Sequence, residues 1–87
     1  MKLNETSSDV ISKRLRRAHG QLGAVIRMLD EGKNCDEIVT QLSAVNKAVS
    51  RAGYSMITAG LEQCYSAKGK SNELDLKKLE KLFLSLA

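Results

Sequence analysis

The sequence contains no proline and no tryptophan, and its 87 residues include only one phenylalanine, two tyrosines and one histidine. The core must therefore be aliphatic, and there is no proline to interrupt a long helix. No segment approaches the roughly 18 consecutive apolar residues that a membrane span needs, and the opening residues MKLNETSSDV are polar, unlike a secretory signal. We therefore expect one small domain, residues 1–87, in the cytoplasm and without membrane contact.

Two kinds of chemistry find no support in the sequence. No glycine-rich phosphate loop is present, and no Asp, Glu and His set occurs at catalytic spacing. We therefore expect neither an enzyme nor a bound cofactor. A different kind of protein, a helical scaffold whose cysteines are only buried side chains, is an alternative.

Apolar residues recur three and four positions apart in three segments, which predicts an all-α protomer of three helices. The first helix follows a disordered arm, residues 1–7, is capped by Ser8 and ends at Gly32. Its apolar positions are Ile11, Leu15, Ala18, Leu22, Val25 and Leu29. The third helix runs from about Asn72 to Leu86, and its apolar face carries Leu76, Leu79, Phe83 and Leu86.

The central helix is the longest, and it is predicted to follow a cap at Asn34 and to end before Gly69. Its apolar seam is Cys35, Ile38, Leu42, Val45, Val49, Ala52, Met56 and Ala59. At about 1.5 Å per residue, Cys35 and Cys64 stand roughly 43 Å apart on such a helix, so they cannot meet within one chain. In an antiparallel pair of these helices, centred near positions 49 and 50, each Cys35 lies opposite Cys64 of the partner subunit. A cysteine pair would therefore join two subunits.

The two cysteines are better explained by chemistry or by a metal than by a structural disulfide, because cytoplasmic thiols are kept reduced. Cys35 lies in the first turn of its helix, where the positive end of the helix dipole favours a nucleophilic thiolate and the neighbouring Asp36 and Glu37 oppose it. Cys64 lies near the opposite end and is the expected resolving thiol. The alternative for each cysteine is a small buried hydrophobic side chain.

Positive charge is concentrated on the first two helices. The chain has 14 Lys and Arg against 10 Asp and Glu, a net charge of +4. Arg14 and Arg17 share one face of the first helix, and Lys47 and Arg51 share a face near the middle of the central helix. In an antiparallel dimer these cations form a two-fold basic surface, which matches the symmetry of palindromic DNA sites. A merely solvated helix surface is the alternative, and no helix-turn-helix is legible.

The segment RLRRAHGQLGAVIRMLDEGKNCDEIVTQLSAVNKAV resembles the CsoR/RcnR family of bacterial repressors. The shared features are an R-x-R-R-x-x-G-Q run, one cysteine after a glycine-containing turn and a Q-x-S-A-V segment, and the resemblance extends over about residues 10–86. It implies a dimer built on antiparallel long helices, a dimer-of-dimers tetramer, and operator DNA that is released when an inducer is sensed. It also implies DNA-contacting cations where this chain has Arg14, Arg17 and Arg51.

The inducer-sensing residues of the family must be compared with this chain one position at a time. The resemblance implies that copper sensors hold Cu(I) with cysteines at positions 35 and 64 and a histidine four residues before the second cysteine, where this chain has Gly60. The histidines of nickel and cobalt sensors and the proline of formaldehyde sensors are missing.

The two-cysteine pattern resembles the persulfide-sensing, CstR-like branch. There, reactive sulfur modifies the first cysteine, and the second cysteine of the neighbouring subunit resolves the product into a di-, tri- or tetrasulfide. We therefore expect a repressor that senses reactive sulfur through Cys35 and Cys64 and holds no metal. The alternative is a Cu(I) sensor that uses the same two thiolates alone.

Overall fold

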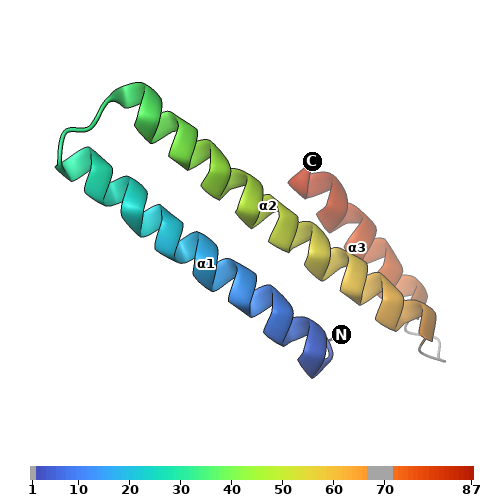
Figure 1. Ribbon diagram of the computed structural model, residues 1–87. Helices are drawn as coiled ribbons and strands as arrows, with labels where there is room; N and C mark the ends of the chain where they lie inside the picture. The colour runs from blue at the N-terminus through green and yellow to red at the C-terminus, as the bar shows by residue number, and fades with distance from the viewer. Residues whose placement is uncertain (1, 67–71) are drawn as a thin grey trace.

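The computed structural model describes residues 2–66 and 72–87, and these residues form three helices and no strand. They are α1 (Glu5–Asp30), α2 (Cys35–Ser66) and α3 (Asn72–Leu86). α2 lies between the other two helices and packs against both, in an elongated arrangement of 55 × 25 × 13 Å (Figure 1). The predicted all-α class is confirmed, and α3 has the predicted bounds. None of these helices is long and apolar enough to cross a membrane.

The start of α1 differs from the prediction. The helix begins at Glu5, and its cap is Asn4, whose side-chain oxygen accepts a 2.8 Å hydrogen bond from the backbone N–H of Ser7. Ser8, the predicted cap, already lies within the helix. An asparagine can satisfy the unpaired amides of a first turn as well as a serine can, and Asn4 lies four positions before the predicted cap.

The residues before α1 are held against α2 rather than left as a disordered arm. The backbone N–H of Asn4 donates to Oε1 of Gln63 at 2.7 Å, and Nε2 of Gln63 donates to the carbonyl oxygen of Lys2. The side-chain amide of Gln63 thus accepts from the backbone of one residue and donates to the backbone of another. The predicted arm is therefore wrong from residue 2 onward, because a contact about 60 positions away in the sequence orders it.

The turn between α1 and α2 is built on Gly32. This residue has φ +69°, in the left-handed region that a residue without Cβ adopts freely. The backbone N–H of Gly32 donates to the carbonyl of Leu29, and that of Lys33 donates to the carbonyl of Met28. These two bonds satisfy carbonyls that the helix end leaves unpaired. The predicted end of the first helix at Gly32 is confirmed.

Only alternate members of each predicted apolar seam close the hairpin of α1 and α2. The buried members recur seven positions apart: Ile11, Ala18 and Val25 on α1, and Ile38, Val45, Ala52 and Ala59 on α2. Most members between them are exposed, and we call Leu22, Leu29, Leu42, Val49 and Met56 the outer stripe, whereas Leu15 is half-buried. Each predicted seam is therefore two stripes, of which one stabilises the protomer and the other faces outward.

α3 packs on the C-terminal half of α2. Leu79 is its buried residue, whereas Phe83 and Leu86, which were predicted on the same apolar face, are 47% and 43% exposed. Leu76 is half-buried against the same part of α2. Because only one side of this short helix is covered, α3 adds little to the core of the hairpin and leaves further apolar surface open.

Candidate functional site

A groove with basic walls runs between the middle turns of α1 and α2. Its volume is about 280 Å³, and the residues that line it are Arg14, Arg17, Ala18, Gln21, Ala44, Lys47, Ala48 and Arg51. We call it the basic groove. The three alanines keep it hollow, because a methyl side chain leaves room between the two helices. Its cationic side chains rise on both sides of that floor.

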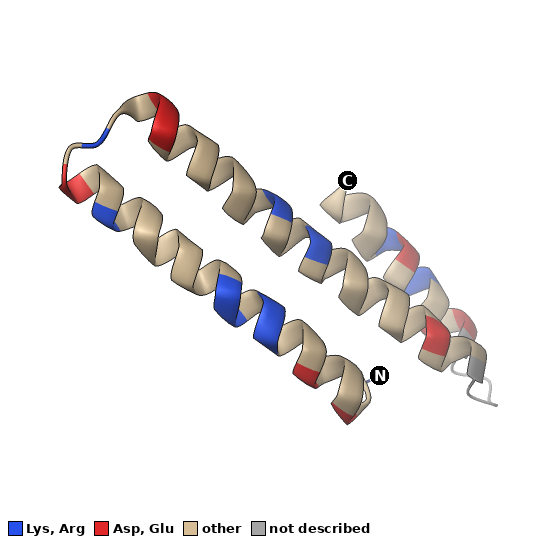
Figure 2. Cartoon of the chain, viewed as in Figure 1, with Lys and Arg blue, Asp and Glu red and all other residues tan. Residues whose placement is uncertain are grey.

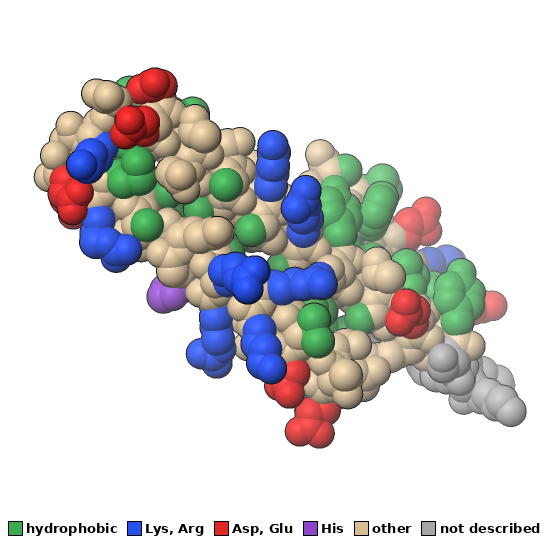
Figure 3. All heavy atoms as spheres, viewed as in Figure 1, with side chains coloured by type: hydrophobic (Ala, Val, Ile, Leu, Met, Phe, Trp, Pro, Cys, Tyr) green, Lys and Arg blue, Asp and Glu red, His purple; other side chains and the backbone are tan. Residues whose placement is uncertain are grey.

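The structure thus brings together all four cations that were predicted from two separate segments. Arg14 and Arg17 come from α1, Lys47 and Arg51 come from α2, and all four are exposed. Figure 2 shows the charged residues of the two helices side by side, and Figure 3 shows their side chains gathered across the middle of the molecule. None of the residues that line the groove is acidic. The groove is therefore suited to an anion with several charges.

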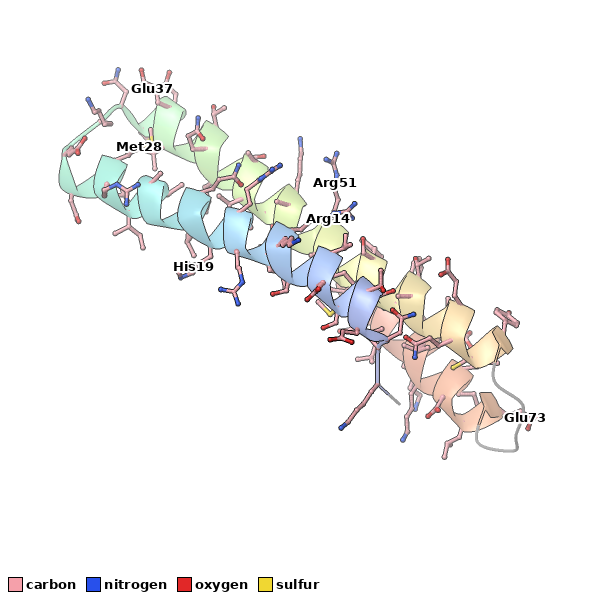
Figure 4. All side chains as sticks on the ribbon, turned by 60° about the horizontal axis from the view of Figure 1, so that its bottom comes forward. Arg14, His19, Met28, Glu37, Arg51 and Glu73 are labelled. Carbon is pink, nitrogen blue, oxygen red and sulfur yellow. The ribbon has the colours of Figure 1, made fainter. Side chains whose placement is uncertain are left out.

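One hydrogen bond positions an arginine of the groove. Nη1 of Arg14 donates to Oγ of Ser55 at 3.2 Å, which draws the guanidinium of α1 toward α2. In Figure 4, Arg14 and Arg51 project to the same side of the hairpin, and His19 projects to another. Ser55 was missed in the sequence, although it lies four residues after Arg51 and hence on the same helix face. That spacing was the available signal.

Guanidinium groups match phosphate oxygens and displace condensed counterions from DNA. If the basic groove contacts DNA, Arg14→Ala and Arg51→Ala should each weaken operator binding and reduce its dependence on salt. We expect the slope of log K against log[salt] to become shallower by about 0.9 for each phosphate that the variant no longer neutralises. The measurement is a fluorescence anisotropy titration of an operator fragment at several salt concentrations.

Arg27→Ala is the matched control for these variants. It removes the same charge from the same helix, but Arg27 lies in the last turn of α1, outside the basic groove. Equal slopes for Arg27→Ala and the two groove variants would mean that net charge alone sets the affinity. Unchanged slopes in both groove variants would place the DNA surface elsewhere.

The cysteines stand at the two ends of α2 and are not brought together within the chain. Cys35 is the first residue of the helix and is exposed, whereas Cys64 is 5% exposed near its other end. α2 is continuous over its 32 residues, so about 1.5 Å per residue separates the two by roughly 43 Å. The prediction that one chain cannot join its own cysteines is confirmed.

The surroundings of the two thiols are unlike. Cys64 packs with Ile57 and Leu79 in an apolar cluster, and Leu61 and Leu76 pack against it. Gly60 is buried one turn earlier on the same helix. For Cys35, the protomer shows an exposed side chain and not the buried hydrophobic one of the alternative. For Cys64 it describes the environment, so this thiol must be uncovered before it can react with anything large.

A metal site within one protomer does not form in the described ranges, 2–66 and 72–87. No three side chains of His, Cys, Asp or Glu come together there in a group that could hold an ion. Thiolates are soft ligands that favour Cu(I), so Cys35 and Cys64 are the side chains of this chain that suit such an ion, and Gly60 has no donor atom.

Comparison with known proteins identifies relatives of this chain. Residues 7–85 match the family described as metal-sensitive transcriptional repressor. The chain is 38% identical over 56 residues to the copper-sensing transcriptional repressor RicR of Mycobacterium tuberculosis, a match that spans 64% of this chain and 58% of the relative. It is 43% identical over 54 residues to the copper-sensing repressor CsoR of Mycobacterium ulcerans, covering 62% of this chain and 46% of that one.

A third relative carries no functional name. The chain is 43% identical over 37 residues to the uncharacterized protein YrkD of Bacillus subtilis, covering 42% of this chain and 59% of the relative. The chain spans about half the length of the curated relatives it matches. No solved structure matches it.

The comparisons confirm the predicted CsoR/RcnR resemblance at the level of the family but not its persulfide-sensing branch. RicR and CsoR are named as transcriptional repressors, in agreement with the prediction that the chain is not an enzyme. The family match extends over the hairpin that carries the basic groove and both cysteines, and over most of α3. This chain belongs to the family of metal-sensitive transcriptional repressors.

Proposed function

We propose that this chain is an operator-binding repressor that works as an oligomer and receives its inducer at two thiols, Cys35 of one protomer and Cys64 of the partner subunit. The observation that carries the proposal is the position of the two cysteines at opposite ends of α2, with exposed apolar residues between them. Antiparallel pairing of two α2 helices about positions 49 and 50 sets each Cys35 against Cys64 of the partner subunit. The pairing occurs twice in each dimer.

The outer stripe supports the dimer. Its members Leu42 and Val49 are 46% and 48% exposed in the protomer, although an aliphatic side chain gains about 1.5–3 kcal/mol when it is fully buried. A domain of 87 residues has little core of its own, so a second copy is the natural cover. The tetramer that the resemblance implies would need still more apolar surface, and α3 offers Leu74 and Leu82.

A dimer of this kind also explains how sensing could act on DNA. The two-fold axis through the middle of α2 places two basic grooves symmetrically, so that together they fit a DNA site with the same symmetry. A bond between the ends of the two α2 helices fixes how the protomers sit on each other. An inducer that favours an arrangement with misplaced grooves would shift the population away from the DNA-bound form.

Reactive sulfur is the inducer that the residues of this chain favour. The exposed thiolate of Cys35 attacks the outer sulfur of an organic persulfide, the S–S bond breaks, and the organic thiolate leaves. The thiolate of Cys64 of the partner subunit then attacks Sγ of Cys35 and expels hydrosulfide, which leaves a disulfide between the subunits. If Cys64 has gained a sulfur in the same way, the product is a trisulfide. In the cytoplasm, where we place the protein, both thiols begin reduced.

Cu(I) is the inducer that the comparisons favour, because two of the relatives are named as copper-sensing repressors. The same two cysteines would hold it as thiolates, a donor set that suits a soft ion. Against this candidate stands Gly60, where the resemblance places a histidine in copper sensors. The names of the relatives support copper, and the residue at position 60 supports reactive sulfur.

One experiment separates these candidates. The reduced protein is exposed without oxygen to an organic persulfide, to Cu(I) or to hydrogen peroxide, and each sample is analysed by intact mass under non-reducing conditions and by operator binding. For a reactive sulfur sensor we expect a covalent dimer that is heavier by whole sulfur atoms, reversed by a reducing thiol, and loss of DNA binding. For a copper sensor we expect DNA release by Cu(I) without a covalent dimer. A scaffold protein would bind no DNA in any sample.

A further inference from the structure

The cover over Cys64 comes from α3 of its own protomer. The buried thiol packs with Leu79, and Leu76 closes the cluster from the same helix. From α2, Ile57 packs in the same cluster. The accessibility of Cys64 therefore depends on where α3 lies, whereas Cys35, at the other end of α2, has no such cover.

Two further contacts fix the C-terminal half of α3 along α2. The rings of Tyr54 and Phe83 meet edge to face with their centroids 5.3 Å apart. Leu86 approaches Gly53 so closely that a Cβ at position 53 would stand 3.0 Å from Cδ1 of this leucine. Gly53 thus forms a notch that lets the end of α3 settle on α2.

These contacts bury little of α3 and stabilise its packing on α2 only weakly. Leu79 is the one residue of its described part that is buried, and Leu74, Leu82 and Leu84 are 60%, 56% and 66% exposed. Hydrophobic side chains accordingly remain visible on this helix in Figure 3. Segments with few buried apolar contacts open at a lower free energy than the rest of a protein. α3 should therefore open while the α1–α2 hairpin stays folded.

We propose that α3 is a lid on Cys64. While the lid is closed, the thiol is shielded and an incoming reagent meets Cys35 first. When α3 moves away from α2 and the contact of Leu79 with Cys64 is lost, Cys64 becomes accessible to Cys35 of the partner subunit. The partner's role in this last step rests on the proposed function, but the lid itself depends only on contacts within one protomer. The lid sets the order of reaction at two thiols that would otherwise compete.

Alkylation rates at the two thiols test the lid. In the reduced protein, each thiolate displaces iodide from iodoacetamide, a neutral reagent, and the adduct at each cysteine is followed by mass spectrometry of peptides. We expect Cys35 to react at least about tenfold faster than Cys64, the factor that corresponds to an opening free energy of about 1.4 kcal/mol. Equal rates at the two thiols would overturn the proposal.

Variants of α3 show whether this helix is the cover. Leu79→Ala and Leu86→Ala should each accelerate alkylation of Cys64 several-fold and leave Cys35 unchanged. Leu84→Ala is the matched control, because it truncates the same residue type on the same helix at an exposed position. If neither Leu79→Ala nor Leu86→Ala changes the rate at Cys64, another surface covers the thiol and the lid is ruled out.

Global unfolding must be told apart from opening of α3. Leu79→Ala removes a buried side chain, whereas Leu86→Ala removes a half-exposed one and spares the core. Hydrogen exchange of the α1 amides, measured on each variant, reports the stability of the hairpin. Faster alkylation of Cys64 with unchanged protection in α1 supports the lid, and faster alkylation with reduced protection in α1 overturns it.

The alkylation assay uses neither DNA nor an inducer, so it can fail independently of the proposed function. If α3 shields Cys64 but the protein binds no operator, the lid proposal stands and the proposed repressor function is wrong. If the protein responds to its inducer as a repressor but Cys64 is always accessible, the proposed function stands and the lid proposal is wrong.

Discussion

Replacement of Gly60 by histidine is expected to raise the affinity for Cu(I) by about a hundredfold or more, on the order of 3 kcal/mol. The new imidazole would lie one helical turn before Cys64, and side chains four positions apart on a helix are about 5–6 Å apart at Cβ. It would add a third donor to two thiolates. Gly60 lines a groove of about 370 Å³ between α2, α3 and Leu3, and the ring would extend into this groove.

The control for this variant is Gly60→Leu, which fills similar space with no donor atom. Both proteins are titrated with Cu(I) against a competing chelator, and the affinities are compared with that of the unmodified chain. If Gly60→Leu and Gly60→His bind alike, the groove does not place position 60 near the thiols. If the unmodified protein already binds as tightly as Gly60→His, the glycine does not limit the site, and copper becomes the better candidate for the inducer.

Periodicity predicted the elements of this fold well, because helices of this length carry a regular pattern. The bounds of α3 and the continuity of α2 were both predicted. The pattern could not show which apolar residues face the neighbouring helix, since positions three and four apart lie close together on one side of a helix. Leu42 and Val45 belong to one predicted seam, yet Val45 is buried and Leu42 is 46% exposed.

The candidate site was predicted where it follows from a single helix and missed where it depends on contacts between helices. The shared face of Arg14 and Arg17 follows from their spacing, and their meeting with Arg51 follows from the hairpin. The hydrogen bond of Gln63 to the residues before α1 joins positions about 60 apart, which no local pattern specifies. For the same reason, the cover of Cys64 by Leu79 was visible only in the structure.

Cys35→Ala and Cys64→Ala are expected to have unequal effects on the response to a persulfide. Without Cys35 the exposed nucleophile is gone, so we expect neither a sulfur adduct nor a covalent dimer, and no release of DNA. Without Cys64 the first step remains: Cys35 gains sulfur, but no partner thiol resolves it and the protein stays monomeric by mass. Intact mass under non-reducing conditions and operator binding measure both effects.

The stability of the two variants should differ as well. Cys35 is exposed, so its replacement should change the free energy of unfolding by less than about 0.5 kcal/mol. Cys64 packs against Ile57 and Leu79, so alanine at this position leaves a small cavity and should cost about 1–2 kcal/mol. Urea unfolding followed by circular dichroism gives both values, and it shows whether a missing response reflects missing chemistry or a loosened fold.

Whether Cys35→Ala and Cys64→Ala have equal or unequal effects distinguishes Cu(I) from reactive sulfur as the inducer. A Cu(I) site with two thiolate ligands loses one ligand in either variant, so both should lose Cu(I) binding and Cu(I)-dependent DNA release to a similar extent. Reactive sulfur needs Cys35 for the first bond and Cys64 only for the second, so only Cys64→Ala should accumulate the monomeric adduct. An adduct of equal amount on both variants would contradict the assignment of Cys35 as the attacking thiol, because a shielded Cys64 would then react just as readily.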